Sequence, residues 1–320
     1  MALGVCFDRT FPASTVVEHA RTVEAAGLDE LWFIEDCFFT AGISLAATAL
    51  ASTERLTVGL GVMPAVARNP AITAMEIATL CDLAPGRFVP GIGHGVQEWM
   101  AQMGARTPSP LTTLDETIST VTRLLAGEEV SYSGREVSLD RVRLDRPPVD
   151  PPPILAGVQQ PKSLALAGRV AGGVVLAEGV GPTYLRRALA HAGREAGDGF
   201  QVATFTLLSI ADDPREAAAN VAPFVAGLVV ERRPALTVLP FFDELLADVT
   251  ARGADALVDL PAEHWLEIGA IGTIDDAVTH VEALTAAGAT SINVFPGPDL
   301  DLAREQIATV ARLRSRLLGD

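Results

Sequence analysis

Residues 55–95 read RLTVGLGVMPAVARNPAITAMEIATLCDLAPGRFVPGIGHG. The two ends are short apolar runs, Leu56–Val62 and Arg87–Ile92, of the length and composition typical of buried strands. The middle, Ala71–Ala84, is predicted to be a helix. A strand–helix–strand unit of this kind places its two strands parallel in one sheet. This stretch therefore predicts an α/β fold with a parallel sheet.

The same alternation continues on both sides of this unit. Helices are predicted from about residue 15 to Gly27, over 43–51, 111–126, 161–170, 182–196, 274–287 and 299–317. The other predicted strands are Leu3–Phe7, Glu30–Glu35, Ile154–Gly157, Gly173–Ala177, Gln201–Ile210 and Thr290–Phe295. Eight strands, each eventually followed by a helix, favour a closed (β/α)8 TIM barrel over an open sheet. No G-x-G-x-x-G follows the first strand, which disfavours a dinucleotide-binding Rossmann unit.

Two segments interrupt this rhythm. Glu128–Leu144 alternates apolar and polar residues around Ser133-Gly134, which predicts an exposed β-hairpin after the fourth helix. Pro214–Ile268 has helical character and little strand character, and it follows the seventh strand. We therefore expect one barrel domain over residues 1–320, with insertions at about 128–150 and 214–268.

Composition narrows the class of protein. The 320 residues carry 24 Lys+Arg and 40 Asp+Glu, a formal net charge of −16. That charge argues against nucleic acid and against anionic membrane surfaces as partners. The longest apolar run, Ile43–Ala51, is far shorter than the ~20 residues that span a bilayer. The N-terminal residues lack a signal-peptide pattern, and the three cysteines have no CxxC spacing, so we expect a cytoplasmic protein.

The candidate site residues follow the predicted strands, because a (β/α)8 barrel carries its site at the carboxyl ends of its strands. Glu35 and Asp36 could transfer a proton or bind a polar ligand; equally, Asp36 could cap a turn and Glu35 form a local ion pair. Cys37 could be a reactive thiol or, as is common for free cysteine, a small buried hydrophobic residue. These strand ends are poor in metal-ligand combinations, and we predict no metal.

Histidine is informative at one of its five positions. His94 stands between Gly93 and Gly95 after the fourth strand, beside bare backbone amides, although a simple strand-to-loop turn would also explain this pattern. We expect three others, in predicted helices, to be ordinary surface or interface residues: His19, His191 and His280. His264-Trp265 lies in the second insertion and could line a pocket or simply pack there.

The 55–95 stretch resembles the signature region of the bacterial-luciferase-like superfamily, and within it the branch that depends on the deazaflavin coenzyme F420. The branch includes methylenetetrahydromethanopterin reductases and F420-dependent sugar-phosphate and alcohol dehydrogenases. The matching residues are Gly59, Gly61, Val62, Arg68-Asn69-Pro70, Ala78-Thr79-Leu80, Pro85-Gly86-Arg87-Phe88, Gly91-Ile92-Gly93 and Gly95. A second segment, Pro152–Gly179, resembles the family's P-x-x-x-A-x-x-x-P-K-x-x-x-L-A-G pattern.

The resemblance implies a cofactor across the carboxyl-terminal mouth of the barrel. It also implies a bulge in the third strand with a non-prolyl cis peptide at Gly61-Val62. The residues expected at the cofactor are Asp36, Cys37, Gly61, Val62, Gly93, His94, Gly95, Ala156, Gly157, Val158, Gln159, Ala177 and Glu178. Our catalytic candidates are His94 first, because imidazole titrates near neutral pH, and then Asp36 and Glu35.

Three departures from the family pattern limit the substrate. Several F420 enzymes have Asp-His where this chain has Asp36-Cys37, and the sugar-phosphate enzymes have a glutamate where this chain has Val96. Between Glu244 and Ala270 the basic side chains are Arg252 and His264, which argues against a phosphosugar clamp.

We therefore expect an F420-dependent oxidoreductase that moves a hydride between C5 of the deazaflavin and a small organic substrate, in a protein that forms a homodimer. Two alternatives remain open. One is an FMN-dependent luciferase-like monooxygenase, and the other is a barrel that binds a flavin or deazaflavin without turnover.

Overall fold

Eight parallel strands form a closed barrel in the computed structural model, which describes residues 1–295, 297 and 299–319. The pairings β8–β9 and β11–β1 close the ring, so the predicted (β/α)8 barrel is confirmed. In barrel order the strands are β1 (Ala2–Phe7), β2 (Glu30–Phe33), β3 (Thr57–Pro64), β4 (Phe88–Gly93), β7 (Leu155–Gly157), β8 (Gly173–Leu176), β9 (Gln201–Ile210) and β11 (Ser291–Val294).

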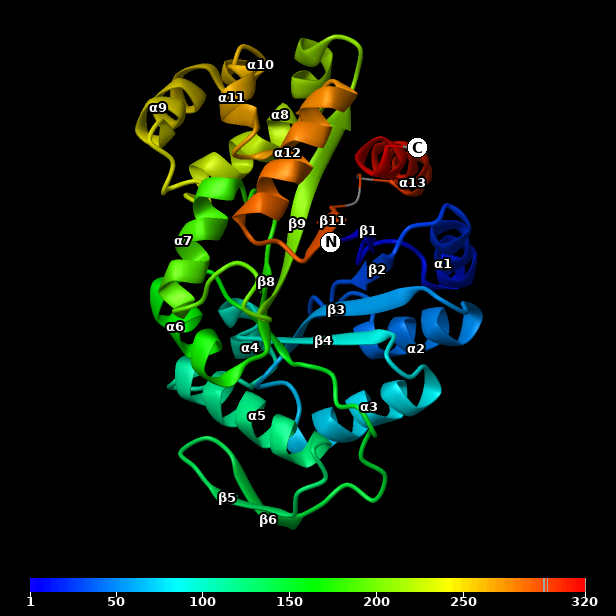
Figure 1. Ribbon diagram of the computed structural model, residues 1–320. Helices are drawn as coiled ribbons and strands as arrows, with labels where there is room; N and C mark the ends of the chain where they lie inside the picture. The colour runs from blue at the N-terminus through cyan, green and yellow to red at the C-terminus, as the bar shows by residue number, and fades with distance from the viewer. Residues whose placement is uncertain (296, 298, 320) are drawn as a thin grey trace.

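Helices surround the strands (Figure 1). The helices that connect the barrel strands are α1 (Val16–Ala25), α2 (Gly42–Ser52), α3 (Pro70–Leu83), α5 (Pro110–Leu125), α6 (Pro161–Val170), α7 (Pro182–Ala192) and α12 (Ile274–Ala287), and α13 (Leu300–Leu318) follows β11. Two short helical segments, η1 (Ala13–Thr15) and α4 (Gln97–Gln102), lie in loops. Buried apolar side chains such as Leu31, Phe33, Leu60 and Ile77 fill the layer between strands and helices. Within the described residues, every helix is too short or too polar to cross a membrane.

The two interruptions lie at opposite ends of the molecule in Figure 1. The hairpin is β5 (Val130–Ser133) with β6 (Ser138–Val142), as expected. The second interruption contains α8 (Pro214–Val230), α9 (Phe242–Arg252), α10 (Asp255–Val258) and α11 (Ala262–Trp265). It is followed by a strand that the sequence pattern did not predict, β10 (Gly269–Gly272), which pairs with β9 outside the barrel ring. Its sequence, GAIG, has a single β-branched residue, so tertiary pairing rather than strand propensity decides it.

The third strand has the expected irregularity. The β3–β4 register shifts between Leu60 and Met63, and the Gly61-Val62 peptide is cis. Both features were implied by the family resemblance, and both are confirmed.

Aromatic side chains fill the barrel interior. The Trp32 and Phe205 rings meet edge to face with centroids 5.5 Å apart, and the Trp32 indole occupies the space that a side chain at Gly59 would need. The indole Nε1 donates to Glu30 Oε2 at 2.6 Å. The interior is thus a packed core, as in other barrels of this type.

Two histidines are placed differently from our expectation. His19 and His280 are buried rather than on the surface, because each faces inward from its amphipathic helix. His280 is fully buried, with Nε2 2.8 Å from Thr206 Oγ1 and Nδ1 2.8 Å from the Leu266 carbonyl. In the second insertion, Trp265 packs in the core and His264 stacks on Phe241.

Candidate active site

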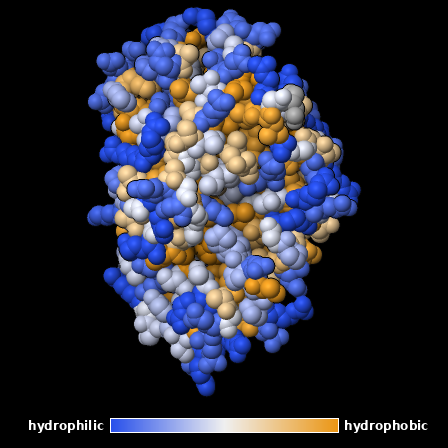
Figure 2. Space-filling view, in the orientation of Figure 1, coloured by the Kyte–Doolittle hydropathy of each residue, from blue (hydrophilic) through white to orange (hydrophobic). Residues whose placement is uncertain are grey.

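A large cavity occupies the carboxyl-terminal mouth of the barrel. Its volume is about 2260 Å³, and residues that follow most of the barrel strands line it. Apolar side chains make up much of the wall, with a smaller number of polar groups, a composition typical of small-molecule sites. Hydrophilic residues dominate the outline of the molecule in Figure 2, and apolar residues gather toward the middle of the face shown.

Most of the predicted site residues line this cavity. They are Glu35, Asp36, Cys37, Gly61, Val62, His94, Gly95, Gly157, Val158, Gln159, Ala177 and Glu178. They come from five strand ends that are separate in sequence, so the barrel brings them together.

Gly93 and Ala156, two expected cofactor residues, are not on the cavity wall. A side chain at Gly93 would meet Val62 Cγ2 at 2.5 Å, and one at Gly157 would meet Val62 Cγ1 at 2.6 Å. Gly93 therefore makes room for Val62 rather than for a ligand. Ala156 is fully buried in the core cluster, because the strand alternation turns it away from the mouth.

His94 lies at the mouth with one ring nitrogen unsatisfied. Its Nδ1 is buried and has no hydrogen-bond partner among the residues that the structure describes. Burial lowers the pKa of His94 below its ordinary value, and the Pro110 carbonyl opposes part of this shift. The imidazole is therefore neutral at pH 7. It can accept or donate a hydrogen bond to a ligand in the cavity.

Glycine is required next to His94. Gly95 has a φ of +70°, and a side chain there would lie 3.0 Å from Met100 Sδ and from Pro64 Cβ. This turn sends the chain from β4 into α4, and so sets the position of His94 at the cavity wall.

Asp36 belongs to a cluster that the sequence did not reveal. Its carboxylate forms an ion pair with Arg9, from the loop after β1. The Arg9 guanidinium lies 4.6 Å from the centre of the Phe39 ring and 5.9 Å from that of Trp99. Arg9 could have been suspected from its place two residues after a barrel strand, although nothing in the sequence shows its partners.

Glu35 has a structural environment. One carboxylate oxygen is paired with Arg68, and the other accepts the Gly42 N–H at 3.0 Å, at the start of α2. The carboxylate thus ties the end of β2 to α2 and to the loop before α3. This is the local ion pair that we considered as the alternative to proton transfer.

We predict that Glu35→Ala lowers the free energy of unfolding by about 2 kcal/mol, because it leaves the half-buried Arg68 with Glu76 as its remaining ion-pair partner and uncaps α2. Glu35→Gln keeps the contact with Gly42 and should lose about half as much. Urea unfolding of both variants tests this. Wild-type stability in Glu35→Ala would return the residue to the list of acid–base candidates.

Cys37 and Glu178 also have defined surroundings. Burial and the nearby Glu35 carboxylate raise the pKa of the Cys37 thiol, so it is neutral at pH 7 and a weak nucleophile. Glu178 Oε1 is 3.1 Å from Arg233 Nη2, and Arg233 Nε is 3.2 Å from Glu231 Oε2.

One face of α8 forms a wall of the cavity that the sequence did not assign to the site. Asn220, Phe224, Gly227 and Glu231 line the cavity at intervals of three and four residues. The helical period of these positions was visible in the sequence, but which face would meet the barrel mouth was not.

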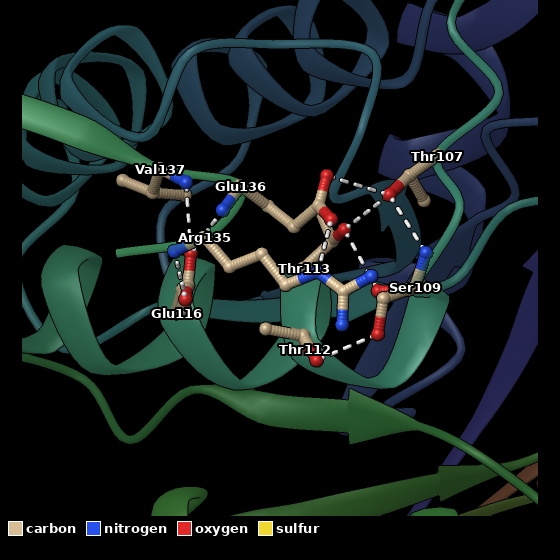
Figure 3. Close-up of polar contacts among 8 residues, drawn as sticks. All are labelled: Thr107, Ser109, Thr112, Thr113, Glu116, Arg135, Glu136 and Val137. Atoms are coloured by element: carbon tan, nitrogen blue, oxygen red, sulfur yellow. Dashed lines mark hydrogen bonds and ion pairs between the residues drawn. The ribbon is translucent and has the colours of Figure 1, made fainter. Parts of the chain in front are cut away.

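The hairpin supports another part of the wall. Glu116 on α5 accepts the backbone N–H groups of Arg135, Glu136 and Val137 at 2.7–2.8 Å (Figure 3). Glu136 in turn accepts from the Thr107 hydroxyl at 2.8 Å, and this network flanks Ser109–Leu111, which line the cavity. Among the described residues, no group of three His, Cys, Asp or Glu side chains is placed to hold a metal ion.

Comparison with known proteins identifies the family. The family model described as luciferase-like monooxygenase matches residues 4–291. The chain belongs to the luciferase-like monooxygenase family. The resemblance in the 55–95 stretch is thereby confirmed over nearly the whole chain.

Two relatives and one solved structure show what this chain is similar to. A 5,10-methylenetetrahydromethanopterin reductase of Methanolobus tindarius is 29% identical over 307 residues, covering 91% of this chain and 93% of its own. An F420-dependent glucose-6-phosphate dehydrogenase of Nakamurella multipartita is 27% identical over 197 residues, covering 58% of each chain. The solved structure of the coenzyme F420-dependent tetrahydromethanopterin reductase of Methanopyrus kandleri superposes with a TM-score of 0.76 at 23% identity, covering 97% of both chains. At that identity the superposition shows the fold.

Proposed function

We propose that this protein is an F420-dependent oxidoreductase that transfers a hydride between C5 of the deazaflavin and a small organic substrate. The observation that carries the proposal is one large cavity at the barrel mouth, lined by His94, by the bulged Gly61-Val62 segment and by Gly157. The names of the luciferase-like relatives support the choice of cofactor.

The residues present fit a flat, polar-edged cofactor. Gly61, Val62 and the Phe205 ring line the cavity together, which gives a flat ring an apolar surface to lie against. Lys162, the only lysine of the chain, lines the same cavity at the start of α6. It has no ion pair among the described residues, and helix N-termini favour anions, so it suits an acidic cofactor side chain.

In this proposal the deazaflavin supplies the hydride chemistry when bound, and the chain orients it. The ring and its edges would be held by the residues at the ends of β3 and β7, namely Gly61, Val62, Gly157, Val158 and Gln159. His94, on the cavity wall, would hold or move a proton at its imidazole ring. Asp36 is held in place by Arg9. The rest of the wall around the bound molecule would be formed by Asp36 together with Cys37, Gly95, Ala177 and Glu178.

Equilibrium titrations with F420 and with FMN, carried out side by side, test which of the two cofactors the protein binds. We expect F420 to bind at least ~10-fold more tightly than FMN, and Lys162→Ala to weaken F420 by a similar factor. Tight FMN binding without F420 binding would replace our proposal by the FMN-dependent monooxygenase. F420 binding with no change in its visible absorbance across a panel of alcohols, aldehydes and ketones would favour a binding protein without turnover.

We also propose that the chain is one catalytic domain that acts in the cytoplasm as a homodimer. The support for a dimer is a stripe of exposed apolar side chains on α3, formed by Ile72, Met75 and Leu83, with Met75 50% exposed. Exposed apolar stripes of this kind mark interaction surfaces.

We predict that Met75→Arg shifts the protein from dimer to monomer, because it places a charge in the middle of the stripe. Val149→Arg, at a 96% exposed position in the segment between β6 and β7, is the matched control and should leave the mass unchanged. Light scattering during gel filtration measures both. A wild-type monomer at micromolar concentration would exclude the dimer.

A further inference from the structure

The cavity extends well beyond the strand ends that we assign to the cofactor. In barrel order, β9 is four strands from β3, so it stands across the mouth from the Gly61-Val62 segment. The helix that follows β9 is α8, whose cavity-facing residues include Phe224, Gly227 and Glu231. This α8 wall is therefore on the side of the mouth opposite the bulged strand.

Two aromatic rings give the α8 wall its character. Phe224 and Phe295 stack with centroids 5.8 Å apart and an interplanar angle of 26°. Phe224 is 43% exposed although it is a large apolar side chain, and both rings line the cavity. Leu207, Val221 and Leu228 extend the apolar surface around them. A ligand with a planar apolar part would cover this surface and remove it from water.

The charges around the α8 wall are predominantly negative. Glu178 and Glu231 flank Arg233 here, and Glu305 on α13 is a further carboxylate on the cavity wall. Arg233 is held by Glu178 at 3.1 Å and by Glu231 at 3.2 Å, so its charge is already compensated. Two carboxylates share one guanidinium here, so this part of the wall keeps a net negative charge, which disfavours an anionic ligand relative to an uncharged or cationic one.

The second insertion supplies no additional cation. Arg252 is on the outer surface, 3.0 Å from Asp259, and is not among the residues that line the cavity. Residues 244–270 therefore contribute no basic side chain to the cavity wall. This agrees with the argument from the sequence against a phosphosugar clamp.

We infer that the α8 wall binds the substrate, and that this substrate is an apolar molecule with a planar ring that is uncharged or cationic. The wall excludes phosphorylated and carboxylated compounds. This inference rests on the proposed function in one respect, namely that the molecule bound at the α8 wall is the substrate of the enzyme. The preference of the wall for such molecules stands on the side chains alone.

Gly227 offers a clean way to block the wall. An added Cβ there meets no atom within 4 Å, and the position is an exposed helical one, so a larger side chain projects into the cavity without disturbing its neighbours. Replacing helical glycine also favours the helix. The matched control is Ala219, which is exposed on the same helix and does not line the cavity.

The experiment measures binding of three probes of one shape by calorimetry or fluorescence, with and without saturating F420. The probes are 2-naphthalenemethanol, 2-naphthylmethylamine and 2-naphthoate. We expect the alcohol and the amine to bind at least ~10-fold more tightly than the carboxylate. Gly227→Leu should weaken the alcohol at least ~10-fold while leaving F420 affinity and the thermal midpoint near wild type, and Ala219→Leu should change none of these.

Equal binding of the carboxylate, or an unchanged alcohol affinity in Gly227→Leu, would overturn the inference. If Gly227→Leu proves unstable, Phe224→Ala replaces it, with the same loss of alcohol binding expected. Failure of the proposed function is seen separately, as absent F420 binding in the wild type. In that case the relative affinities of the three probes would still decide whether the α8 wall prefers uncharged and cationic rings to anionic ones.

Discussion

Replacing His94 by alanine should lower turnover on the order of 10²–10⁴-fold, the usual range for loss of a positioned acid–base group. The reason is that His94 lines the cavity while its buried Nδ1 has no hydrogen-bond partner among the described residues. Thermal stability should change little, because the ring contributes to the mouth and not to the packed interior. Turnover is measured with the first active compound from the alcohol and carbonyl panel, alongside F420 affinity and the thermal midpoint.

The pH profile adds a second readout to this prediction. Burial lowers the pKa of His94 below its ordinary value, so activity that depends on the neutral ring should hold through neutral pH and fall at a lower pH than for a free histidine. His264→Ala is the control, because His264 stacks on Phe241 away from the cavity wall. Normal turnover and normal cofactor affinity in His94→Ala would leave Asp36 and Glu35 as the candidates. A loss of affinity with normal turnover at saturation would make His94 a binding residue only.

The stability of the protein should fall steeply in mild acid because of His280. Complete burial lowers its pKa to about 4, against an ordinary value of 6.5. Between these two values the unfolded chain binds a proton that the folded chain refuses, so stability rises with pH. The contribution is fully present above pH 6.5 and declines as the pH falls toward 4. For this residue alone the decline from pH 7 to pH 5 is about 2 kcal/mol, and about 3 kcal/mol by pH 4.

A comparison with His280→Gln isolates this residue from other acid-sensitive groups. His19, whose pKa burial also lowers to about 4, is unchanged in both proteins and cancels in the difference. Urea unfolding at pH 5, 6, 7 and 8 gives the free energy of unfolding of both proteins. The wild-type value minus the His280→Gln value should fall by about 2 kcal/mol between pH 7 and pH 5. A difference that does not change with pH would contradict the prediction.

The positions of the candidate residues were predicted better than their surroundings. The sequence ranked His94 ahead of Glu35 on titration range alone, since each is a titratable residue at a strand end. The structure separates them by their partners: Glu35 has Arg68 and Gly42, while His94 Nδ1 has none among the described residues. Likewise Gly93 and Gly95 are two residues apart, yet one makes room for Val62 and the other allows the turn beside His94.

What the sequence determined by itself is the architecture. Apolar runs and helical periods are local properties, so eight βα units, the hairpin and the place of the mouth could be deduced without coordinates. The bulge and cis peptide at Gly61-Val62 came from a family pattern over a contiguous stretch. Only the tertiary structure decided which side chains meet across the barrel. The pairing of Arg9 with Asp36, the burial of His280 and the face of α8 that lines the cavity all depend on contacts between segments far apart in sequence. Such contacts follow from strand register and helix rotation, which no local pattern specifies.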